Sequence, residues 1–424
     1  MPGVGLVCLL SGCGIRPAGA DWPPLGKKWF DRAQVSFRNC DIEDAQYAVD
    51  NALRVAGTRK EVRLLASSIA LAQLEFDRAV QLLQTVEGAE ARGVRGRALW
   101  YSGKVESAAD ELEQLTSDPD VRDPWAVEVA KLARRGSGRK PFELSGGLLA
   151  VSEMPQVGSS ALIVPLEING EPGLGMVATG TAEAVVDTGG GGEASWVSLR
   201  FGERIEVKDV PALAHDLSGI SGQINAPIKM LLGVNLLRHL HPTIDLTGGQ
   251  FVVRTFEPPP PPFATTVRVA YLRGGGMLMR GAFGADQTAP AASLLIDTSM
   301  SFPLALDEQG WKKAGISTKS LPKMGESGAL RQGTLPVLRI GAFELPRVAG
   351  VYGAPVADIE KGLNVDLDGL VGSGLLAAFR VTLRDRGLTM WLEPPPLANE
   401  PPPPALEAPQ KPAPPAASPA RKPG

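Results

Sequence analysis

The sequence predicts a multidomain α plus all-β protein, with an N-terminal α-helical repeat module followed by two β-barrel lobes. Alanine-rich amphipathic segments recur through the first third of the chain, and short apolar runs of β type fill most of the rest. These runs form two diverged copies of one unit, residues 161–256 and 267–394. At 424 residues, the chain is long enough for two or three domains, each with its own core.

The helical module is predicted over residues 27–135. Ala45, Ala79 and Ala108 each lie near the start of an amphipathic segment, and the two spacings between them are similar. A period near 34 with a small residue where helices cross resembles tetratricopeptide repeats in a degenerate form. An ordinary helical bundle is the alternative. Neither arrangement carries a catalytic motif here, so binding or spacing is the expected role.

The two β copies share three anchors in the same order. The anchors are residues 176–181 with 295–299, 197–202 with 337–341, and 231–237 with 370–376. Within the first anchor, Ala178 stands opposite Asp297. The two copies therefore differ at the position where the second copy carries a carboxylate that could take part in acid–base chemistry.

Proline-rich segments divide and end the β region. We expect lobe 1 over residues 141–256, a proline linker over 257–263 and lobe 2 over 264–394. A run of prolines is stiff and extended, so this linker is expected to space the lobes without joining either core. The tail, 395–424, is rich in proline and poor in apolar residues, and we expect it to be disordered.

Asp297-Thr298-Ser299 follows an apolar strand, and an apolar pair with Gly372 comes near the end of the same copy. This pattern resembles the aspartic peptidases of the small retropepsin-like type, fused in tandem as in bilobal pepsins. The resemblance implies that Asp297 is the catalytic aspartate, that Thr298 braces the two catalytic loops and that Ser299 is the small residue of the turn. It also implies that Gly372 lies on the strand behind that loop. Thr179, Gly180 and Gly233 are the lobe 1 counterparts.

Lobe 1 lacks the expected aspartate. Amide hydrolysis by water needs one carboxylate and one carboxylic acid, and two adjacent aspartates supply both by sharing a proton. A second candidate, Asp187, begins an Asp-Thr-Gly string shortly after Ala178. The internal alignment sets Asp187 opposite Asp307, and the segment from Asp187 to Gly202 is too short for the strands expected there. We expect Asp187 to lie in a turn after a strand, and a displaced catalytic role is the alternative.

The segment after the catalytic turn also differs between the copies. In the family, a hairpin there folds over the substrate as a flap. Lobe 1 has the glycine string 189–192, which suits a flexible connection better than a hairpin. Lobe 2 has the longer segment 308–334, which is expected to supply one flap.

The N-terminus carries an apolar run, residues 4–10, that is too short to span a bilayer and is typical of a signal peptide. Leu10-Ser11-Gly12-Cys13 resembles a bacterial lipoprotein lipobox. The resemblance implies a signal peptide over residues 1–13 and acylation of Cys13. Because Gly14 follows the cysteine, it also implies an outer-membrane location facing the periplasm.

Composition excludes several classes of function. A formal net charge of −3 gives no reason to expect nucleic acid as a partner. His239 and His241 are expected in a turn, and neither a metal nor a cofactor is predicted. The cysteines stand at positions 8, 13 and 40, two of them in the predicted leader, so no disulfide framework is expected.

Three functions remain open. The first is an envelope-anchored lipoprotein whose aspartic-peptidase-like lobes have lost peptidase activity. Such a protein would bind an extended peptide or a protein partner, in the interlobe cleft or on the helical repeats. The second is an active aspartic endopeptidase that uses Asp297 with Asp187. The third is a structural lipoprotein that acts through its helical repeats.

Overall fold

The computed structural model describes residues 22–155, 157, 160–286, 288–325 and 328–394. Cys13, the rest of the predicted signal peptide and the tail 395–424 lie outside the described residues. Within the described ranges, no helix is both long enough and apolar enough to cross a membrane.

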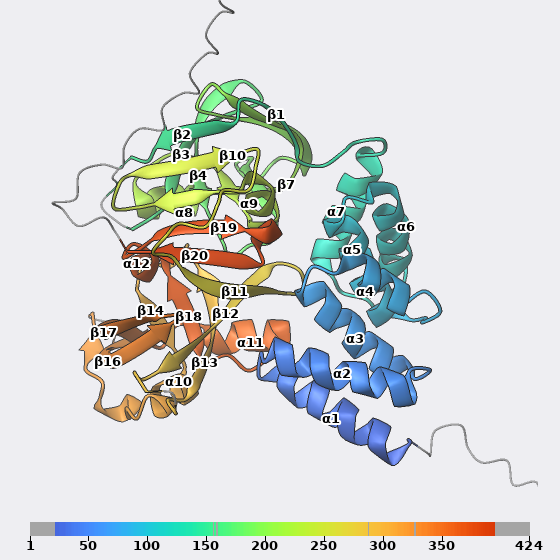
Figure 1. The fold of residues 1–424 in the computed structure, drawn as a ribbon. Coiled ribbons are helices and arrows are strands. Elements are labelled where there is room, and N and C mark those ends of the chain that lie inside the picture. Colours follow the sequence, from blue (N-terminus) through green and yellow to red (C-terminus); the bar gives the residue numbers. More distant parts are fainter. Residues whose placement is uncertain (1–21, 156, 158–159, 287, 326–327, 395–424) are drawn as a thin grey trace, which may run out of the picture. The chain divides into compact units, whose positions relative to one another are not determined.

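The first part of the described chain is entirely helical (Figure 1). Its helices are α1 (Pro24–Arg38), α2 (Ile42–Ala56), α3 (Lys60–Ala72), α4 (Phe76–Leu82), α5 (Ala89–Tyr101), α6 (Val105–Thr116) and α7 (Pro124–Arg135). Asp41 and Asp123 cap α2 and α7 by accepting a hydrogen bond from the backbone of the first turn. Ala45, Ala79 and Ala108 are completely buried in the packing of the helices.

Lobe 1 contains a closed six-stranded barrel. The barrel order is β7-β5-β8-β4-β3-β6, and β6 pairs back to β7. The elements of this half of the chain are β1 (Glu143–Gly146), β2 (Leu149–Glu153), β3 (Ile163–Ile168), β4 (Glu171–Val177), β5 (Ala184–Asp187), β6 (Ser195–Phe201), β7 (Ile205–His215), α8 (Ser218–Ile224), β8 (Ile228–Leu232), α9 (Val234–Leu240), β9 (Thr243–Asp245) and β10 (Gln250–Arg254).

Lobe 2 repeats this topology. Its barrel order is β16-β17-β14-β18-β13-β12, closed by pairing of β12 with β16. Its elements are β11 (Thr265–Leu272), β12 (Gly276–Phe283), β13 (Ala291–Asp297), β14 (Leu304–Leu306), α10 (Glu308–Lys313), η1 (Thr318–Ser320), β15 (Lys323–Met324), β16 (Leu330–Ile340), β17 (Phe343–Tyr352), α11 (Val356–Leu363), β18 (Gly369–Gly372), α12 (Ser373–Leu376), β19 (Arg380–Arg384), η2 (Asp385–Gly387) and β20 (Thr389–Glu393).

The strand pairings of the two barrels correspond one to one. β4 runs parallel to β8, as β13 runs parallel to β18. β5 is parallel to β7 and antiparallel to β8, as β14 is parallel to β17 and antiparallel to β18. The two halves of the β region are therefore copies of one fold.

A shared sheet joins the lobes. Its order is β11-β20-β19-β9-β10-β2, so each lobe contributes three strands. At its centre β9 pairs with β19, and the hydroxyls of Thr243 and Thr382 are 2.8 Å apart. The proline linker does not hold the lobes apart, although the stiffness of its sequence favoured a spacer. Instead Pro258, Pro259 and Pro261 line a pocket over the polar face of this sheet.

The helical module contacts both lobes. At the end of α1, the Arg38 guanidinium pairs with Asp366 of lobe 2, 3.0 Å away. At the other end of the module, the indole N–H of Trp196 in β6 donates to the carbonyl of Leu132 in α7 at 3.0 Å. The module therefore spans the two halves of the β region.

Candidate functional site

Two loops meet between the lobes, one after β4 and one after β13. β4 ends at Val177, which pairs with Leu232 of β8. β13 ends at Asp297, which pairs with Gly372 of β18. The two loops therefore leave equivalent edges of equivalent barrels.

Thr179 and Thr298 hold these loops together through four reciprocal hydrogen bonds. The backbone N–H of each threonine donates to the Oγ1 of the other, both at 3.0 Å. Thr298 Oγ1 donates to the Val177 carbonyl at 2.7 Å, and Thr179 Oγ1 donates to the Ile296 carbonyl at 2.9 Å. Both threonines are buried. We call this set of bonds the threonine clasp; it defines which residues of the two lobes are equivalent.

Ala178 and Asp297 occupy equivalent positions, because each precedes the clasp threonine of its lobe. Ala178 is buried, and its N–H donates to the Leu232 carbonyl at 3.1 Å. Asp297 is half-buried, and its Oδ1 accepts from the N–H of Ser299 at 3.0 Å and from its hydroxyl at 2.6 Å. A Cβ on Gly180 would lie 2.6 Å from the same oxygen. The backbone of lobe 1 at Gly180 thus lies against the Asp297 carboxylate. At the equivalent position in lobe 1, the methyl group of Ala178 replaces a second carboxylate.

Gly233 and Gly372 support the two loops from behind. Each immediately precedes a short helix, α9 or α12, that is packed under the loop. A Cβ on Gly372 would clash with the carbonyls of Met300 and Phe302, and one on Gly233 would clash with the Glu183 carbonyl. Only glycine lets the strand approach the loop this closely in either lobe. The two glycines therefore hold equivalent places in the two lobes.

Asp187 lies at the end of β5 and is bonded within lobe 1. Its carboxylate accepts from the backbone N–H groups of Leu217 at 3.2 Å and Gly189 at 3.3 Å, and from Lys229 Nζ at 3.1 Å. Partial burial opposes ionisation, but these donors outweigh it and lower the pKa of Asp187. Asp307, which caps α10, occupies the equivalent place in lobe 2. The geometry is that of a turn residue, and it does not support the alternative of a displaced catalytic aspartate.

The lobes differ in the segment that follows. In lobe 2, strands β15 and β16 form a hairpin with Lys323 opposite Arg331. In lobe 1, residues 188–194 join β5 to β6 without a strand of their own. Arg135 of α7 holds the end of this connection, pairing with Glu193 and donating to the Ala194 carbonyl at 2.6 Å. The helical module therefore contacts lobe 1 where lobe 2 carries its hairpin.

His239 and His241 are at the end of a helix and not in the expected turn. His239 belongs to the last turn of α9, and its ring stacks on Phe142 with centroids 4.5 Å apart. His241 follows as the left-handed C-cap. The apolar pair Leu236-Leu237 continues the helical turn far enough to include the first histidine.

Glu183 is a buried acid that sequence reasoning missed. Its carboxylate accepts from the indole N–H groups of Trp100 at 3.4 Å and Trp125 at 3.0 Å, and from the Tyr101 hydroxyl at 3.0 Å. Burial raises the pKa of Glu183, against the lowering effect of these donors. An acid in the otherwise apolar run 182–186 was the available signal. We call Glu183 and its three donors the aromatic cage.

Arg238 of α9 lies beside the aromatic cage and is also buried. Its guanidinium lies over the rings of Phe76, Tyr101 and Tyr271, 5.5 to 6.0 Å from their centroids. Burial lowers the pKa of Arg238. The cage and this arginine together join the helical module to the loop that carries the clasp, because Glu183 lies only three residues after Gly180.

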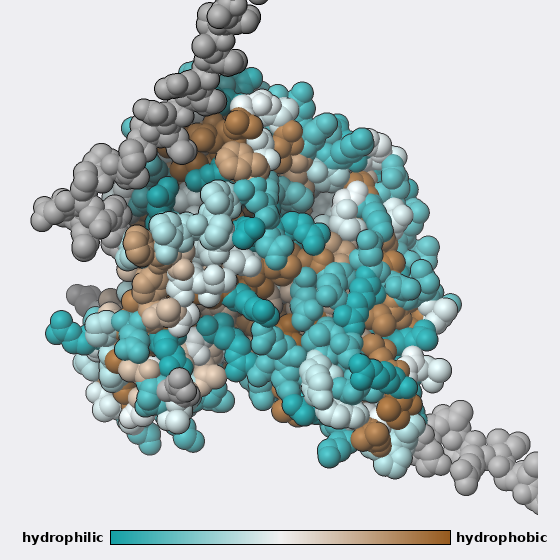
Figure 2. Space-filling model, viewed as in Figure 1, coloured by the Kyte–Doolittle hydropathy of each residue, from teal (hydrophilic) through white to brown (hydrophobic). Residues whose placement is uncertain are grey.

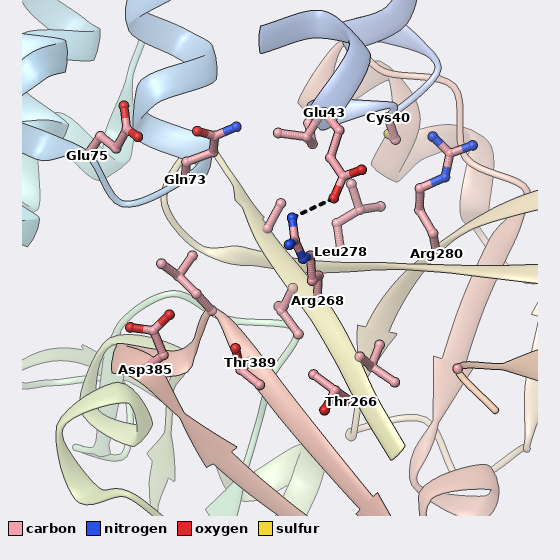
Figure 3. Close-up of a pocket in the computed structure, with 16 residues that line it drawn as sticks. Cys40, Glu43, Gln73, Glu75, Thr266, Arg268, Leu278, Arg280, Asp385 and Thr389 are labelled. Atoms are coloured by element: carbon pink, nitrogen blue, oxygen red, sulfur yellow. Dashed lines mark hydrogen bonds and ion pairs between the residues drawn. The ribbon is translucent and has the colours of Figure 1, made fainter. Parts of the chain in front are cut away.

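A pocket of about 620 Å³ lies elsewhere, between the helical module and strand β11 (Figure 3). Glu43 from α2 and Arg268 from β11 face one another across it, with a 2.8 Å ion pair. Arg280 at its edge pairs with Asp41 at 2.6 Å. Its two arginines are thus already neutralised by carboxylates of the module, which is typical of a polar junction between packed parts of a chain.

The sequence matches no family model, and no curated protein matches it. Among solved structures, the chain is similar to a retropepsin-like aspartic protease from Rickettsia conorii. The two share 19% identity over 30% of this chain and 90% of that chain, with a TM-score of 0.23.

Proposed function

We propose that this protein is an envelope-anchored, aspartic-peptidase-like protein that does not cleave peptide bonds. In this proposal it binds an extended peptide or a protein partner between its lobes. The supporting observation is the threonine clasp, which sets Ala178 opposite Asp297 in otherwise equivalent loops.

The missing acid removes half of the chemistry. In a carboxylate pair, one member accepts a proton from water while the other donates a proton to the substrate. The two roles need two carboxyl groups that share one proton, because both cannot ionise at short range. Asp297 lies against the backbone of Gly180, two residues after Ala178, and the equivalent position in lobe 1 carries a methyl group in place of a second carboxyl.

What remains is suited to recognising a backbone. The half-buried Asp297 carboxylate is a hydrogen-bond acceptor, and the exposed Ser299 beside it supplies a hydroxyl. Lobe 2 also keeps its hairpin of β15 and β16. An extended peptide presents the amide N–H groups that such acceptors bind. The ligand class in this proposal is therefore an extended chain segment and not a small molecule.

Cleavage of an unfolded protein at acidic pH tests the proposal. We expect wild type and Asp297→Asn to be equally inactive. A fluorescence-polarisation assay with labelled, oxidised insulin B chain as an extended probe should then report binding by wild type and weaker binding by Asp297→Asn. Cleavage by wild type that Asp297→Asn abolishes would establish an active endopeptidase instead.

The envelope anchor is tested separately. Replacing the predicted acylation site, Cys13→Ser, should move the protein from the membrane fraction to the soluble fraction. Membrane association that survives this change would argue against lipidation at Cys13.

A further inference from the structure

The helical hairpin of α1 and α2 has an exposed end where α1 begins. Gly26 packs closely against Val55 and Ala56, and the Arg59 guanidinium lies over the Trp22 ring, 4.5 Å from its centroid. These contacts bring together the start of α1, the end of α2 and the loop to α3. We call this end of the hairpin the tip; its residues are Trp22, Leu25, Lys28, Arg54, Val55 and Arg59.

The tip is both apolar and basic. Leu25 is 54% exposed and Val55 is 40% exposed. Figure 2 shows hydrophobic surface at this end of the hairpin, interspersed with hydrophilic residues. Lys28, Arg54 and Arg59 carry positive charge, and none of the three forms an ion pair with another residue in the described ranges. The acids Asp21 and Glu61 adjoin the tip in the sequence, and Asp31 of α1 is already paired with Lys27.

The opposite end of α1 is occupied. Arg38 is held by Asp366, and the Asp366 N–H donates to the Arg38 carbonyl at 2.7 Å. A helix of 15 residues is about 22 Å long, so the tip is about that far from the contact with lobe 2. The tip can therefore meet an outside surface without disturbing the packing of the module on the lobes.

The tip is also close in sequence to the predicted anchor. Trp22 follows Cys13 by nine residues, which span at most about 30 Å when fully extended. An acylated Cys13 would keep the tip within that distance of the membrane surface. Any affinity of the tip for lipid would then act at high effective concentration.

We propose that the tip lies against an anionic lipid surface, with Leu25 and Val55 among the headgroups, the half-buried Trp22 beside them and the three cations over them. Tryptophan favours the membrane–water interface because its ring is apolar and its N–H is polar. Basic residues near an anionic leaflet each strengthen binding by about fivefold. This contact involves none of the residues around Asp297. A failure of the proposed peptide binding would therefore leave the proposed membrane contact unaffected, and the reverse also holds.

Vesicle co-sedimentation tests the proposal with the full chain carrying Cys13→Ser, so that no acyl chain contributes. We expect binding to vesicles of phosphatidylcholine with phosphatidylglycerol, and much weaker binding to phosphatidylcholine alone. The double variant Lys28→Gln/Arg54→Gln should lower binding to the anionic vesicles about 25-fold. Leu25→Ser should also weaken it, because an apolar contact is lost.

A matched control separates the tip from overall charge. Lys312→Gln/Lys319→Gln removes two exposed cations from lobe 2 and should leave vesicle binding unchanged. Circular dichroism should report equal helix content in all variants, because the side chains substituted on the tip and on lobe 2 are exposed. The proposal is overturned by a failure to bind anionic vesicles, or by equal losses in the tip variant and the control.

Discussion

Replacing Thr298 by valine tests the threonine clasp directly. Valine has nearly the shape of threonine, so the change removes the hydroxyl without opening a cavity. Two short hydrogen bonds are lost, the one donated to the Val177 carbonyl at 2.7 Å and the one accepted from the Thr179 N–H at 3.0 Å, together with a longer contact to the Thr179 hydroxyl at 3.4 Å. Both groups left behind are buried, and each bond contributes about 1 kcal/mol. The clasp should therefore be weakened by about 2 kcal/mol.

Amide hydrogen exchange measures this locally. A loss of about 2 kcal/mol raises the population of the open loop roughly 30-fold, so the Thr179 amide should exchange about 30-fold faster. Peptides from α1 and α2, which contain none of the residues of the aromatic cage, should exchange at the wild-type rate. The matched control is Thr298→Ser, which keeps the hydroxyl and should keep most of the protection.

The reciprocal variant Thr179→Val should have the same effect on the Thr298 amide, because the bonds are equivalent. If Thr298→Val left exchange of the Thr179 amide unchanged, the loops would not be joined as described. The equivalence of Ala178 and Asp297 would then lose its basis.

Three further predictions follow from the same geometry. Gly372→Ala should destabilise the protein by more than about 3 kcal/mol in urea unfolding, whereas Gly362→Ala, whose Cβ would meet nothing within 4 Å, should not. Glu183→Gln should remove a pH dependence of the urea midpoint. Because burial raises the pKa of Glu183, the folded state binds its proton more tightly, so wild-type stability should fall as pH rises from its usual pKa through the raised value. Ala178→Asp should restore a carboxylate pair with Asp297, detectable as acid-pH cleavage or as a raised pKa of one of the two acids.

The location of the candidate site could be predicted because its parts are specified locally. Asp297 and Gly372 belong to short motifs within one lobe, and the repeated unit allowed each copy to be checked against the other. The role of Thr298, whose partner Thr179 is 119 positions away, was implied by the resemblance and not by a short stretch of chain. The position of Asp187 followed from its closeness to Gly202 in the sequence, since the segment between them leaves no room for the strands that lobe 2 has there. For Asp187, the internal alignment and the length of the segment were enough to predict that it lies in a turn.

The contacts between distant parts of the chain could not be predicted in this way. Thr243 and Thr382 meet at the centre of the shared sheet although 139 residues separate them. Nothing in either short strand specifies the other as its partner. The partners in the aromatic cage could not be predicted either, because Glu183 and Trp100 come from different parts of the chain, 83 residues apart. An acid in an apolar run indicates that a partner exists, but not which one.

The clasp also explains how lobe 1 keeps its loop without the aspartate. All four of its bonds use threonine hydroxyls and backbone groups, and none uses the side chain at position 178 or that of Asp297. An aspartate at position 178 would add a second carboxylate at close range, which is unfavourable unless a proton is shared. Alanine there removes that repulsion and leaves the clasp intact. The loop geometry is thus independent of the side chains at positions 178 and 297, so a closed pair of loops is evidence for the fold and not for peptidase activity.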